Sequence, residues 1–507
     1  MKSPAPELRL GTRGSMLAMA QSRQVADALA AFHPELRVRL VPVITRGDRD
    51  QTTPLARVND RDFFSAEIDT ALLTGRVDFT VHSRKDLEGS RPGGIATVAI
   101  PARANPRDAV LFRPSVLDRL RRGERLRIGT SSARRAYHVA RFLERALPQL
   151  NGKPDLRCEP LRGPVDQRLH RLHESGPDAL DGVVLALAGL ERLWQDPDGR
   201  AAIEPRLEGI RRMVLPLSRC PTAPGQGALA IECRADDAIT RALLESLHHP
   251  ETAADVAAEY AAASDPAGAA IATFGATALR VPQLGRLLFA AGEQDGTQRL
   301  QWAAPGTPAS SRAWDGGQWH RACQHRPLAW QTPERGHRAV FVAHSRALSP
   351  ARKLGDEQRV WVSGWQSWQR LSAGGLWIEG CADGLGFDAL RTTLALGVLQ
   401  LPPLDEWLAL TRAGAESTWQ DSGVGCVLGT YTLRPPRPQA MEQLRREAMQ
   451  ATDFFWSSRD QYLALRECLP EAARHACGAG KTLSALRELG AQPRAFPSRE
   501  AWQEWLA

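Results

Sequence analysis

Residues 8 to 43 read LRLGTRGSMLAMAQSRQVADALAAFHPELRVRLVPV, an apolar run, a helical pattern and a second apolar run. The first run predicts a strand over Leu8 to Thr12, and the second predicts a strand over Val38 to Val43. Apolar side chains at helical spacing between them predict a helix over about Met16 to Phe32. A strand, a helix and a strand in this order are typical of a parallel sheet covered by helices, which is an α/β fold.

The same alternation continues over the first half of the chain. Helical sequence near Phe64 to Leu73 precedes an apolar run over Val77 to Val81, and the pattern resumes after a crossing predicted at Pro101 to Pro106. The further strands are predicted at Leu126 to Gly129, Leu156 to Leu161 and Val183 to Leu187. The sequence therefore predicts two α/β lobes.

A second crossing between the lobes is predicted at Pro216 to Gly227, where Pro and Gly are frequent. The apolar run Ala228 to Glu232 follows, and we expect it to return to the first lobe as a strand. Two lobes that are joined by two crossings form a hinged pair, an arrangement typical of periplasmic binding proteins.

The chain as a whole divides into five predicted parts. They are a first lobe (1–104 with 214–235), a second lobe (105–213), a small α+β domain (236–291), a linker (292–335) and a second α/β body (336–507). The linker prediction depends on Gly, Gln, Ser and Pro in residues 292–319. Strands of the second body are predicted at Ala339 to Ala343, Val360 to Ser363, Cys426 to Leu433 and Asp453 to Ser457.

Cationic and hydroxyl side chains follow four of the predicted strands in the two lobes. These candidate site residues are Arg13, Ser15, Lys85, Asp86, Ser131, Ser132, Arg134, Arg135, Arg162 and Arg168. Residues just past the carboxyl ends of parallel strands line the ligand crevice of an open sheet, so we expect them to converge on a polyanionic ligand. Asp86 is then a lone acid among cations, where it can stabilise a developing positive charge or move a proton.

The charge composition argues against a nucleic-acid-binding protein. The net charge is +8, but 65 Lys and Arg are interspersed with 57 Asp and Glu, and no basic block stands out. Only five of the basic residues are lysine, and Lys85 is one of them. Arginine suits carboxylate ligands because its planar guanidinium can bind them in a bidentate manner.

The eight cysteines have no CxxC spacing and no His-rich partner motif, which predicts reduced thiols and no metal site. Residues 1–10 lack the apolar core of a signal peptide, and no run is long enough to span a bilayer. We expect a cytoplasmic monomer with no membrane or nucleic-acid partner.

Several motifs of the first half are similar to those of one enzyme family. They are LGTRGSMLA (10–18), VITRGD (43–48), VHSRKD (81–86), NPRDA (105–109), GTSSARR (129–135), LRG (161–163) and APGQGALAIE (223–232). In this order they resemble porphobilinogen deaminase, also called hydroxymethylbilane synthase, over about residues 7–280. That family joins porphobilinogen units head to tail into a linear tetrapyrrole and releases ammonia at each addition.

The resemblance implies roles for the candidate residues. Asp86 would be the catalytic carboxylate, which binds pyrrole N–H groups and stabilises the azafulvene-like cation left when ammonia departs. Lys85 would be its partner. The side chains that would grip the acetate and propionate arms are Arg13, Ser15, Ser131, Ser132, Arg134, Arg135, Arg162 and Arg168.

The C-terminal region, from about residue 336, resembles a divergent uroporphyrinogen-III synthase. The similar stretches are VFVAHSRAL (340–348), VWVSGWQSW (360–368), DFFWSSRDQY (453–462), HACGAGKTLSAL (475–486) and FPSREAW (496–502). The resemblance suggests Ser457, Ser458 and Thr482 as substrate-binding candidates. Gly478 to Thr482 is not a full phosphate loop, because His475 stands where that motif has glycine, and we predict a glycine turn that opens a helix.

The sequence departs from the deaminase pattern at three places. The family attaches a dipyrromethane primer to a cysteine, but Ala270 stands at that position, with Cys220 and Cys233 as substitute anchors to be considered. The acidic stretch Asn59 to Asp62 replaces a glycine-rich, lysine-bearing lid, and Pro164 removes a backbone donor beside Arg162.

These departures leave three functions open. The first half could polymerise porphobilinogen on a primer that is held non-covalently, with cyclisation in the C-terminal body. It could instead be a tetrapyrrole-binding scaffold that does not polymerise, which Ala270 favours. The third possibility is a binding module for small anions, which would have no use for an acid at Asp86.

Overall fold

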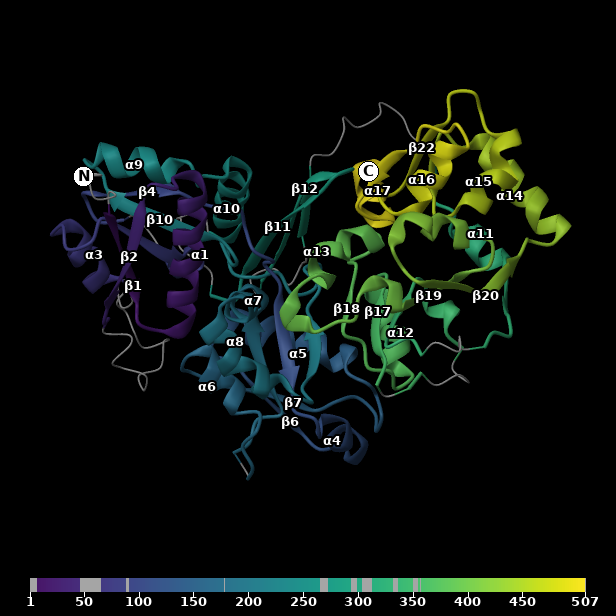
Figure 1. Ribbon diagram of the computed structural model, residues 1–507. Coiled ribbons are helices and arrows are strands. Elements are labelled where there is room, and N and C mark those ends of the chain that lie inside the picture. Colours follow the sequence, from purple (N-terminus) through teal and green to yellow (C-terminus); the bar gives the residue numbers. More distant parts are fainter. Residues whose placement is uncertain are drawn as a thin grey trace.

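The computed structural model describes residues 7–45, 65–87, 91–176, 178–264, 272–292, 299–302, 312–331, 336–349, 354–355 and 357–506. Strands in these residues form five sheets with helices packed on them, which confirms the mixed α/β class. In Figure 1 the first two sheets lie at the left and the lower centre, and the C-terminal part lies at the right. No helix in the described residues combines the length and apolar character that a bilayer span requires.

Lobe 1 is a five-stranded sheet in the order β2-β1-β3-β10-β4. β1 is parallel to β2 and β3, whereas β10 is antiparallel to both of its neighbours. Helix α1 begins after Ser15, whose hydroxyl accepts a hydrogen bond from Ala18 N at 3.3 Å and caps the first turn. The elements are β1 (Glu7–Arg13), α1 (Met16–Phe32), β2 (Arg37–Val43), α3 (Ala66–Leu73), β3 (Phe79–Ser83), β4 (Ile95–Ala99), β10 (Leu229–Arg234) and α9 (Ala238–Glu245).

Lobe 2 is a second five-stranded sheet in the order β7-β6-β8-β5-β9. β6 is parallel to β7 and β8, but β5 is antiparallel to β8 and β9. The elements are β5 (Asp108–Phe112), α4 (Val116–Arg122), β6 (Leu126–Gly129), α5 (Ala133–Ala146), β7 (Leu156–Glu159), α6 (Val165–His170), β8 (Gly182–Ala186), α7 (Leu187–Gln195), α8 (Pro197–Ile203) and β9 (Arg211–Val214).

The parallel sheets predicted from the sequence are therefore mixed sheets. The exceptions to parallel pairing, β5 and β10, are the strands that directly follow the two crossings. A strand that arrives from the other lobe is not joined to its neighbours by a helical crossover, so nothing requires it to run parallel to them. The predicted return of residues 228–232 to lobe 1 is confirmed by β10.

The two crossings lie against each other. Ala104 N donates a hydrogen bond to Gly227 O at 3.2 Å. Gly227 has a φ of 87°, and a Cβ atom there would lie 2.5 Å from the carbonyl oxygen of Ala104. Only glycine allows this approach of the two backbones.

A small three-stranded sheet follows lobe 1. Helix α10 (Pro250–Ala263) packs on β11 (Gly275–Val281) and β12 (Gly285–Ala291), and β12 pairs with β13 (Arg299–Trp302). β13 lies beyond the predicted boundary at residue 291. Helix α9 also differs from expectation, because Leu244 and its neighbours are buried in the core of lobe 1 rather than in the small domain.

The C-terminal part contains two units, and Figure 1 shows most of the first in green and most of the second in yellow. The six-stranded unit has the order β15-β20-β19-β16-β17-β18, and the four-stranded unit has the order β14-β21-β22-β23. The first comprises β15 (Gln324–Pro327), β16 (Ala339–Val342), β17 (Arg359–Val362), α12 (Trp365–Ala373), β18 (Gly380–Cys381), α13 (Arg391–Leu394), β19 (Trp407–Arg412) and β20 (Cys426–Arg434). The second comprises β14 (Ala313–Trp314), α11 (Gly317–Ala322), α14 (Pro438–Gln450), β21 (Asp453–Trp456), α15 (Arg459–Leu465), β22 (Arg474–Gly478), α16 (Lys481–Glu488), β23 (Arg494–Phe496) and α17 (Arg499–Leu506).

Part of the segment expected as a linker, residues 292–335, is integral to the C-terminal body. β14 and α11 belong to the four-stranded unit, and β15 is the edge strand of the six-stranded unit. Trp314 and Trp319 are buried in that core, which explains why a segment with little periodicity is ordered. The chain therefore passes between the two units twice, once before β15 and once after β20.

Lobe 2 and the six-stranded unit share hydrophobic cores. Trp368 of α12 is fully buried, and its indole N–H donates to Ala146 O of α5 at 2.9 Å. The ring of Phe142 lies 5.1 Å from the rings of both Trp365 and Trp368. Since these residues come from both halves of the chain, lobe 2 and the six-stranded unit form one packed body.

Candidate active site between lobes 1 and 2

A cavity of about 310 Å³ lies between the two lobes, and we call it the interlobe cavity. It is lined by seven of the ten candidate residues from the sequence, namely Arg13, Ser15, Lys85, Asp86, Arg135, Arg162 and Arg168. Arg13 is the last residue of β1, and Lys85 and Asp86 lie in the 3-10 turn directly after β3. The ends of strands from both lobes thus meet at one site.

Asp86 is exposed and lies at the lining of this cavity. It is not the lone acid that we expected, because Asp166 of α6 also lines the cavity. The two acids differ in their surroundings: the charge of Asp86 raises the pKa of both Lys85 and Arg168. Asp86 is therefore the acid whose negative charge interacts with the cations of the cavity.

Burial and the neighbouring guanidinium of Arg135 lower the pKa of Lys85 to about 8. The pKa of Arg168 is lowered to about 10 for the same two reasons. Both side chains are thus held charged in surroundings that solvate a cation poorly. An anionic ligand would relieve this cost, because an opposite charge favours the charged form.

Arg162 and Arg135, which both line the cavity, differ in the N–H groups that they can offer to a ligand. The guanidinium of Arg162 has a buried Nη1 with no hydrogen-bond partner among the described residues, so it can donate to a ligand. Arg135 is already paired: its Nη2 donates to Asp108 Oδ1 at 2.7 Å, and its Nη1 donates to Val184 O at 3.2 Å. Arg135 supplies charge to the cavity more than it supplies free donors.

The other three candidate residues lie outside the lining of the interlobe cavity. Ser132 is the N-cap of α5 and accepts from Arg135 N at 3.3 Å, and Ser131 exchanges hydrogen bonds with the backbone of Leu161. Arg134 is buried, and it donates to Asp108 Oδ2 and to Pro221 O, both at 2.9 Å. In this structure they hold the backbone around the site rather than facing its cavity.

The sequence analysis assigned no role to Gln226, which the structure places at the centre of this network. Its side-chain oxygen accepts from Lys85 Nζ at 3.1 Å, and its nitrogen donates to Asp108 Oδ1 at 2.9 Å. Gln226 therefore orients Lys85 and connects it to the buried pair of Asp108 and Arg135. The signal was present in the motif APGQGALAIE, which contains this residue.

We expect Asp108→Asn to lower the free energy of unfolding by about 3 kcal/mol near neutral pH, because two buried guanidinium groups lose their counter-ion. Burial opposes ionisation of Asp108, but Arg135 and Arg134 more than offset it and hold the pKa of this carboxyl well below its usual range. The stabilisation is therefore complete above the unfolded-state pKa of about 4 and is lost as the pH falls below it.

Denaturation of the wild type and the variant over a range of pH would measure this difference. The gap in stability should narrow progressively below about pH 4. Asp118→Asn, at an exposed carboxyl that pairs with Arg121, is the matched control and should show almost no gap. If the difference in stability between the wild type and Asp108→Asn did not depend on pH, the ionised carboxylate of Asp108 would not be its source.

Residues 8–242 match the family model described as "Porphobilinogen deaminase, dipyromethane cofactor binding domain". The match covers lobes 1 and 2, which we therefore call the deaminase domain. This family associates the chain with tetrapyrrole biosynthesis and with transferase chemistry of the hydroxymethylbilane synthase type. Porphobilinogen is the substrate of that family.

Three solved structures are similar to about half of the chain. The BenM effector binding domain with its effector benzoate is 16% identical and covers 52% of this chain and 97% of its own, with a TM-score of 0.27. The methionine binding protein MetQ is 13% identical, with 50% and 94% covered and a TM-score of 0.28. YhfZ from Shigella flexneri is 14% identical, with 51% and 89% covered and a TM-score of 0.24.

The dipyrromethane group of this family raises the question of whether the deaminase domain can hold it. The cationic lining of the interlobe cavity, above all the unsatisfied Nη1 of Arg162, suits the carboxylates of such a group. The residue at the expected attachment position does not suit a covalent bond to this group. The expected anchor position, Ala270, carries no nucleophile and lies outside the described residues, as does the acidic stretch 59–62.

The two substitute anchors considered from the sequence are buried away from the cavity. Cys220 is 1% exposed with its Sγ 3.8 Å from His138 O, and Cys233 is fully buried in the core of lobe 1. Burial raises the pKa of the Cys233 thiol to about 11, and it raises that of Cys220 still further, so neither is a ready nucleophile. All eight cysteines are free thiols, as predicted.

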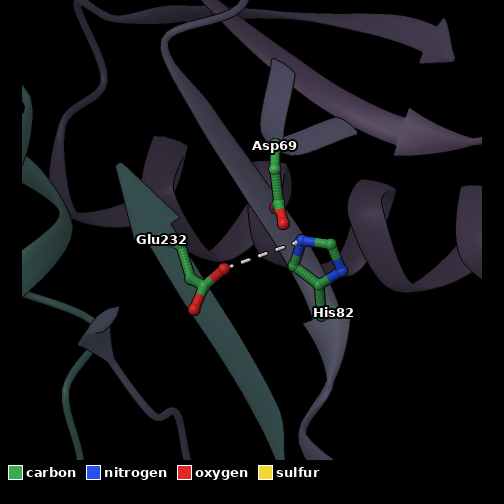
Figure 2. A group of neighbouring side chains, drawn as sticks. All are labelled: Asp69, His82 and Glu232. Carbon is green, nitrogen blue, oxygen red and sulfur yellow. Dashed lines mark ion pairs between the residues drawn. The ribbon is translucent and has the colours of Figure 1, made fainter. Parts of the chain in front are cut away.

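One group of side chains in the described residues has the proximity of metal ligands. Figure 2 shows Asp69, His82 and Glu232 converging in lobe 1, with His82 Nε2 3.8 Å from Glu232 Oε2. The guanidinium of Arg91 already binds both carboxylates, donating to Asp69 at 2.5 Å and to Glu232 at 2.9 Å. Arg91 thus forms ion pairs with both carboxylates, and these side chains make a buried ion-pair network in the deaminase domain.

The candidate residues of the C-terminal body lie beside α11 and α16. Ser457 Oγ is 2.6 Å from His320 Nε2, and Thr482 Oγ1 donates to Ser457 O at 3.4 Å. Ser458 is the N-cap of α15. Gly480 precedes α16, which confirms the predicted glycine turn, and Lys481 Nζ donates to Thr418 O and lies 4.3 Å from the ring of Trp419.

Proposed function

We propose that the interlobe cavity joins porphobilinogen units head to tail with release of ammonia. The observation that carries the proposal is the placement of Asp86 beside Lys85 in a cavity that Arg13, Arg162 and Arg168 also line. A pyrrole with acetate and propionate arms needs cations for its carboxylates and one acid for its ring N–H. These are the groups that the cavity offers.

In the proposed reaction the protonated aminomethyl group of porphobilinogen breaks its carbon–nitrogen bond, and neutral ammonia leaves with the bonding electrons. The remaining methylene-pyrrole is cationic. Asp86 accepts a hydrogen bond from the ring N–H and stabilises this cation. The free α-carbon of a second pyrrole then attacks the methylene carbon, and this α-carbon loses its proton to water, which restores the aromaticity of that ring.

The chain's own residues bind and orient the growing acid. Arg162 and Arg168 would bind carboxylate arms from the lobe 2 side, and Arg13 and Lys85 would bind them from the lobe 1 side. A bound dipyrromethane would supply the acceptor carbon for the first addition. With Ala270 at the anchor position, this group would be held by the same cations without a thioether bond.

A second function, in which the domain binds tetrapyrroles without polymerising them, is favoured by Ala270. Incubation of the purified full chain with porphobilinogen separates the two. Ammonia release that depends on Asp86 supports polymerisation, whereas porphobilinogen binding without ammonia release supports the scaffold. Mass spectrometry of the denatured chain would reveal any primer that is attached at another residue.

We further propose that the C-terminal body cyclises the linear tetrapyrrole in the manner of uroporphyrinogen-III synthase. Two observations support this role. The body has two α/β units between which the chain passes twice, and a cavity lined with serine hydroxyls lies against both. Incubation with porphobilinogen and analysis of the uroporphyrin isomers after oxidation would test it, since isomer III requires the cyclising activity.

The pH dependence of ammonia release should report Lys85. Its pKa of about 8 means that it loses its charge as the pH rises through that value, so kcat/KM should fall above about pH 8. Lys85→Arg keeps a charge at this position and should retain more of its neutral-pH activity at about pH 9 than the wild type does. An identical alkaline decline in both proteins would exclude Lys85 as its source.

A further inference from the structure

A second cavity, of about 670 Å³, lies where the two halves of the chain meet, and we call it the junction cavity. The six-stranded unit contributes Ser345, Ser363 and Arg370, and the four-stranded unit contributes Ser498, Glu500 and Glu504. The remaining walls come from β12 and β13 and from the crossing that joins lobe 2 to lobe 1. The size is sufficient for a ligand of several rings.

The crossing contributes Ser218 and Arg219, which belong to the deaminase domain. The guanidinium carbon of Arg219 lies 5.5 Å from the ring centre of Trp365, at the start of α12. Trp365 is in turn held against Phe142 of lobe 2. The deaminase domain thus places a cation on the wall of a cavity whose other polar groups come from the C-terminal body.

A second group of lining residues consists of serine hydroxyls beside a second cation, Arg370. Arg370 Nη1 lies 3.5 Å from Ser345 Oγ, and the backbone N–H of Ser345 donates to Ser367 Oγ at 3.1 Å. Ser363 Oγ is 3.5 Å from the same hydroxyl. These groups surround the first turn of α12, whose N-cap Gly364 has no side chain to accept from the free N–H groups. This combination of donors suits a carboxylate.

The acids of the cavity differ in their ion pairs: Asp383 pairs with the buried Arg107, and Glu500 lies 3.9 Å from Arg499, its neighbour on α17. Asp383 accepts from Arg107 at 3.3 Å and from the backbone and hydroxyl of Ser218, so its charge is compensated inside the protein. Glu500 and Glu504 come from α17, in the four-stranded unit. Carboxylates on that side can accept hydrogen bonds from N–H donors of a ligand.

We propose that the junction cavity binds a polycarboxylic polypyrrole and that Arg219 of the deaminase domain is a required part of this site. Arg219 and Arg370 would bind carboxylate arms, while Glu500 and Glu504 would accept hydrogen bonds from pyrrole N–H groups. The proposal rests on the cyclising function proposed above, and it adds that neither half of the chain contains the complete site. The linear tetrapyrrole that we propose as the product of the interlobe cavity has both the carboxylate arms and the pyrrole N–H groups that these residues would bind.

The test uses uroporphyrin III, an octacarboxylate of the same pyrrole chemistry, with the full chain. Binding is followed by porphyrin fluorescence, and hydrogen exchange locates it. We expect protection of residues 217–221 and 363–370. Arg219→Gln and Arg370→Gln should each weaken binding about tenfold, Arg219→Lys should restore most of it, and the tetracarboxylate coproporphyrin III should bind more weakly.

Arg445→Gln, at an exposed arginine of α14, is the matched control and should leave the affinity unchanged. Protection that is confined to the interlobe cavity, or equal affinity of the wild type and Arg219→Gln, would overturn the proposal, as would absence of binding. Ammonia release is measured on the same proteins. If it persists when uroporphyrin III does not bind at the junction, the composite site is wrong while the deaminase proposal stands.

Discussion

Asp86→Asn is expected to lower the rate of ammonia release from porphobilinogen by about a hundred- to a thousandfold. Asparagine retains the size of the side chain and can still accept one hydrogen bond, but it removes the negative charge that would stabilise the methylene-pyrrole cation. The substrate's carboxylates would still meet the cations that line the interlobe cavity. The loss should therefore appear in kcat more than in KM.

Asp166, the second acid of the interlobe cavity, provides a comparison that tests whether Asp86 is the catalytic acid. Asp166 lies in the first turn of α6, where the helix dipole favours a negative charge without any role in catalysis. We expect Asp166→Asn to lower the rate by less than about tenfold. Asp27→Asn, at an exposed position of α1, is the neutral control. If Asp166→Asn were the more damaging change, the catalytic acid would be misassigned.

The elements of the two lobes could be predicted well from the sequence, because apolar periodicity is a local signal. The predicted helix over Met16 to Phe32 has those bounds in the structure. Strand direction was predicted less well, since pairing in a sheet depends on the path of the chain between strands. β5 and β10 run antiparallel to their neighbours although their sequences have the same apolar character as the parallel strands.

The site was predictable to the extent that it lies at strand ends. Arg13 is the last residue of β1 and Asp86 closely follows β3, and the sheet alone brings them to one edge. Arg134 shows why the rule has limits: it is adjacent to Arg135 on α5, yet it points to Pro221 and Asp108. Both arginines bind the buried carboxylate of Asp108, and the sequence does not reveal that only Arg135 also lines the cavity.

The contacts between the halves could not be predicted from either half alone. Residues 312–331 have the composition of a linker, but Trp314 and Trp319 complete the core of the four-stranded unit. Similarly, Trp365 and Trp368 pack on Phe142 of the deaminase domain. Aromatic residues outside a periodic pattern were the available signal that these segments are buried.

The contact that joins both crossings of the deaminase domain to the C-terminal body depends on Asp383. Its Oδ2 accepts from Arg107 Nη2, directly after the first crossing, and from Leu217 N in the second, both at 3.3 Å, and its Oδ1 accepts from Ser218 N at 3.2 Å. Asp383 and Arg107 have side chains that are 0% and 4% exposed, so this ion pair is shielded from water. Asp383 also has a φ of 52°, a left-handed conformation that non-glycine residues seldom adopt.

Asp383→Ala is therefore expected to destabilise the local structure of the crossings by about 3 kcal/mol, because the buried Arg107 loses its counter-ion and two amides lose their acceptor. Native-state hydrogen exchange would measure this at Leu217 and Ser218, whose protection should fall about a hundredfold. Asp388→Ala, in the same part of the chain but with a side chain that is 69% exposed, should change protection by less than about threefold.

A double-mutant cycle of Asp383 and Arg107 would show whether their ion pair is responsible for the loss of hydrogen-exchange protection. If it does, Arg107→Gln and Asp383→Ala should each lower protection, and the double variant should lose clearly less than the sum of the two in free energy. Full additivity would mean that the backbone amides, rather than Arg107, give Asp383 its importance. Unchanged protection in Asp383→Ala would show that the crossings are fixed by the shared core of lobe 2 and the six-stranded unit, without this carboxylate.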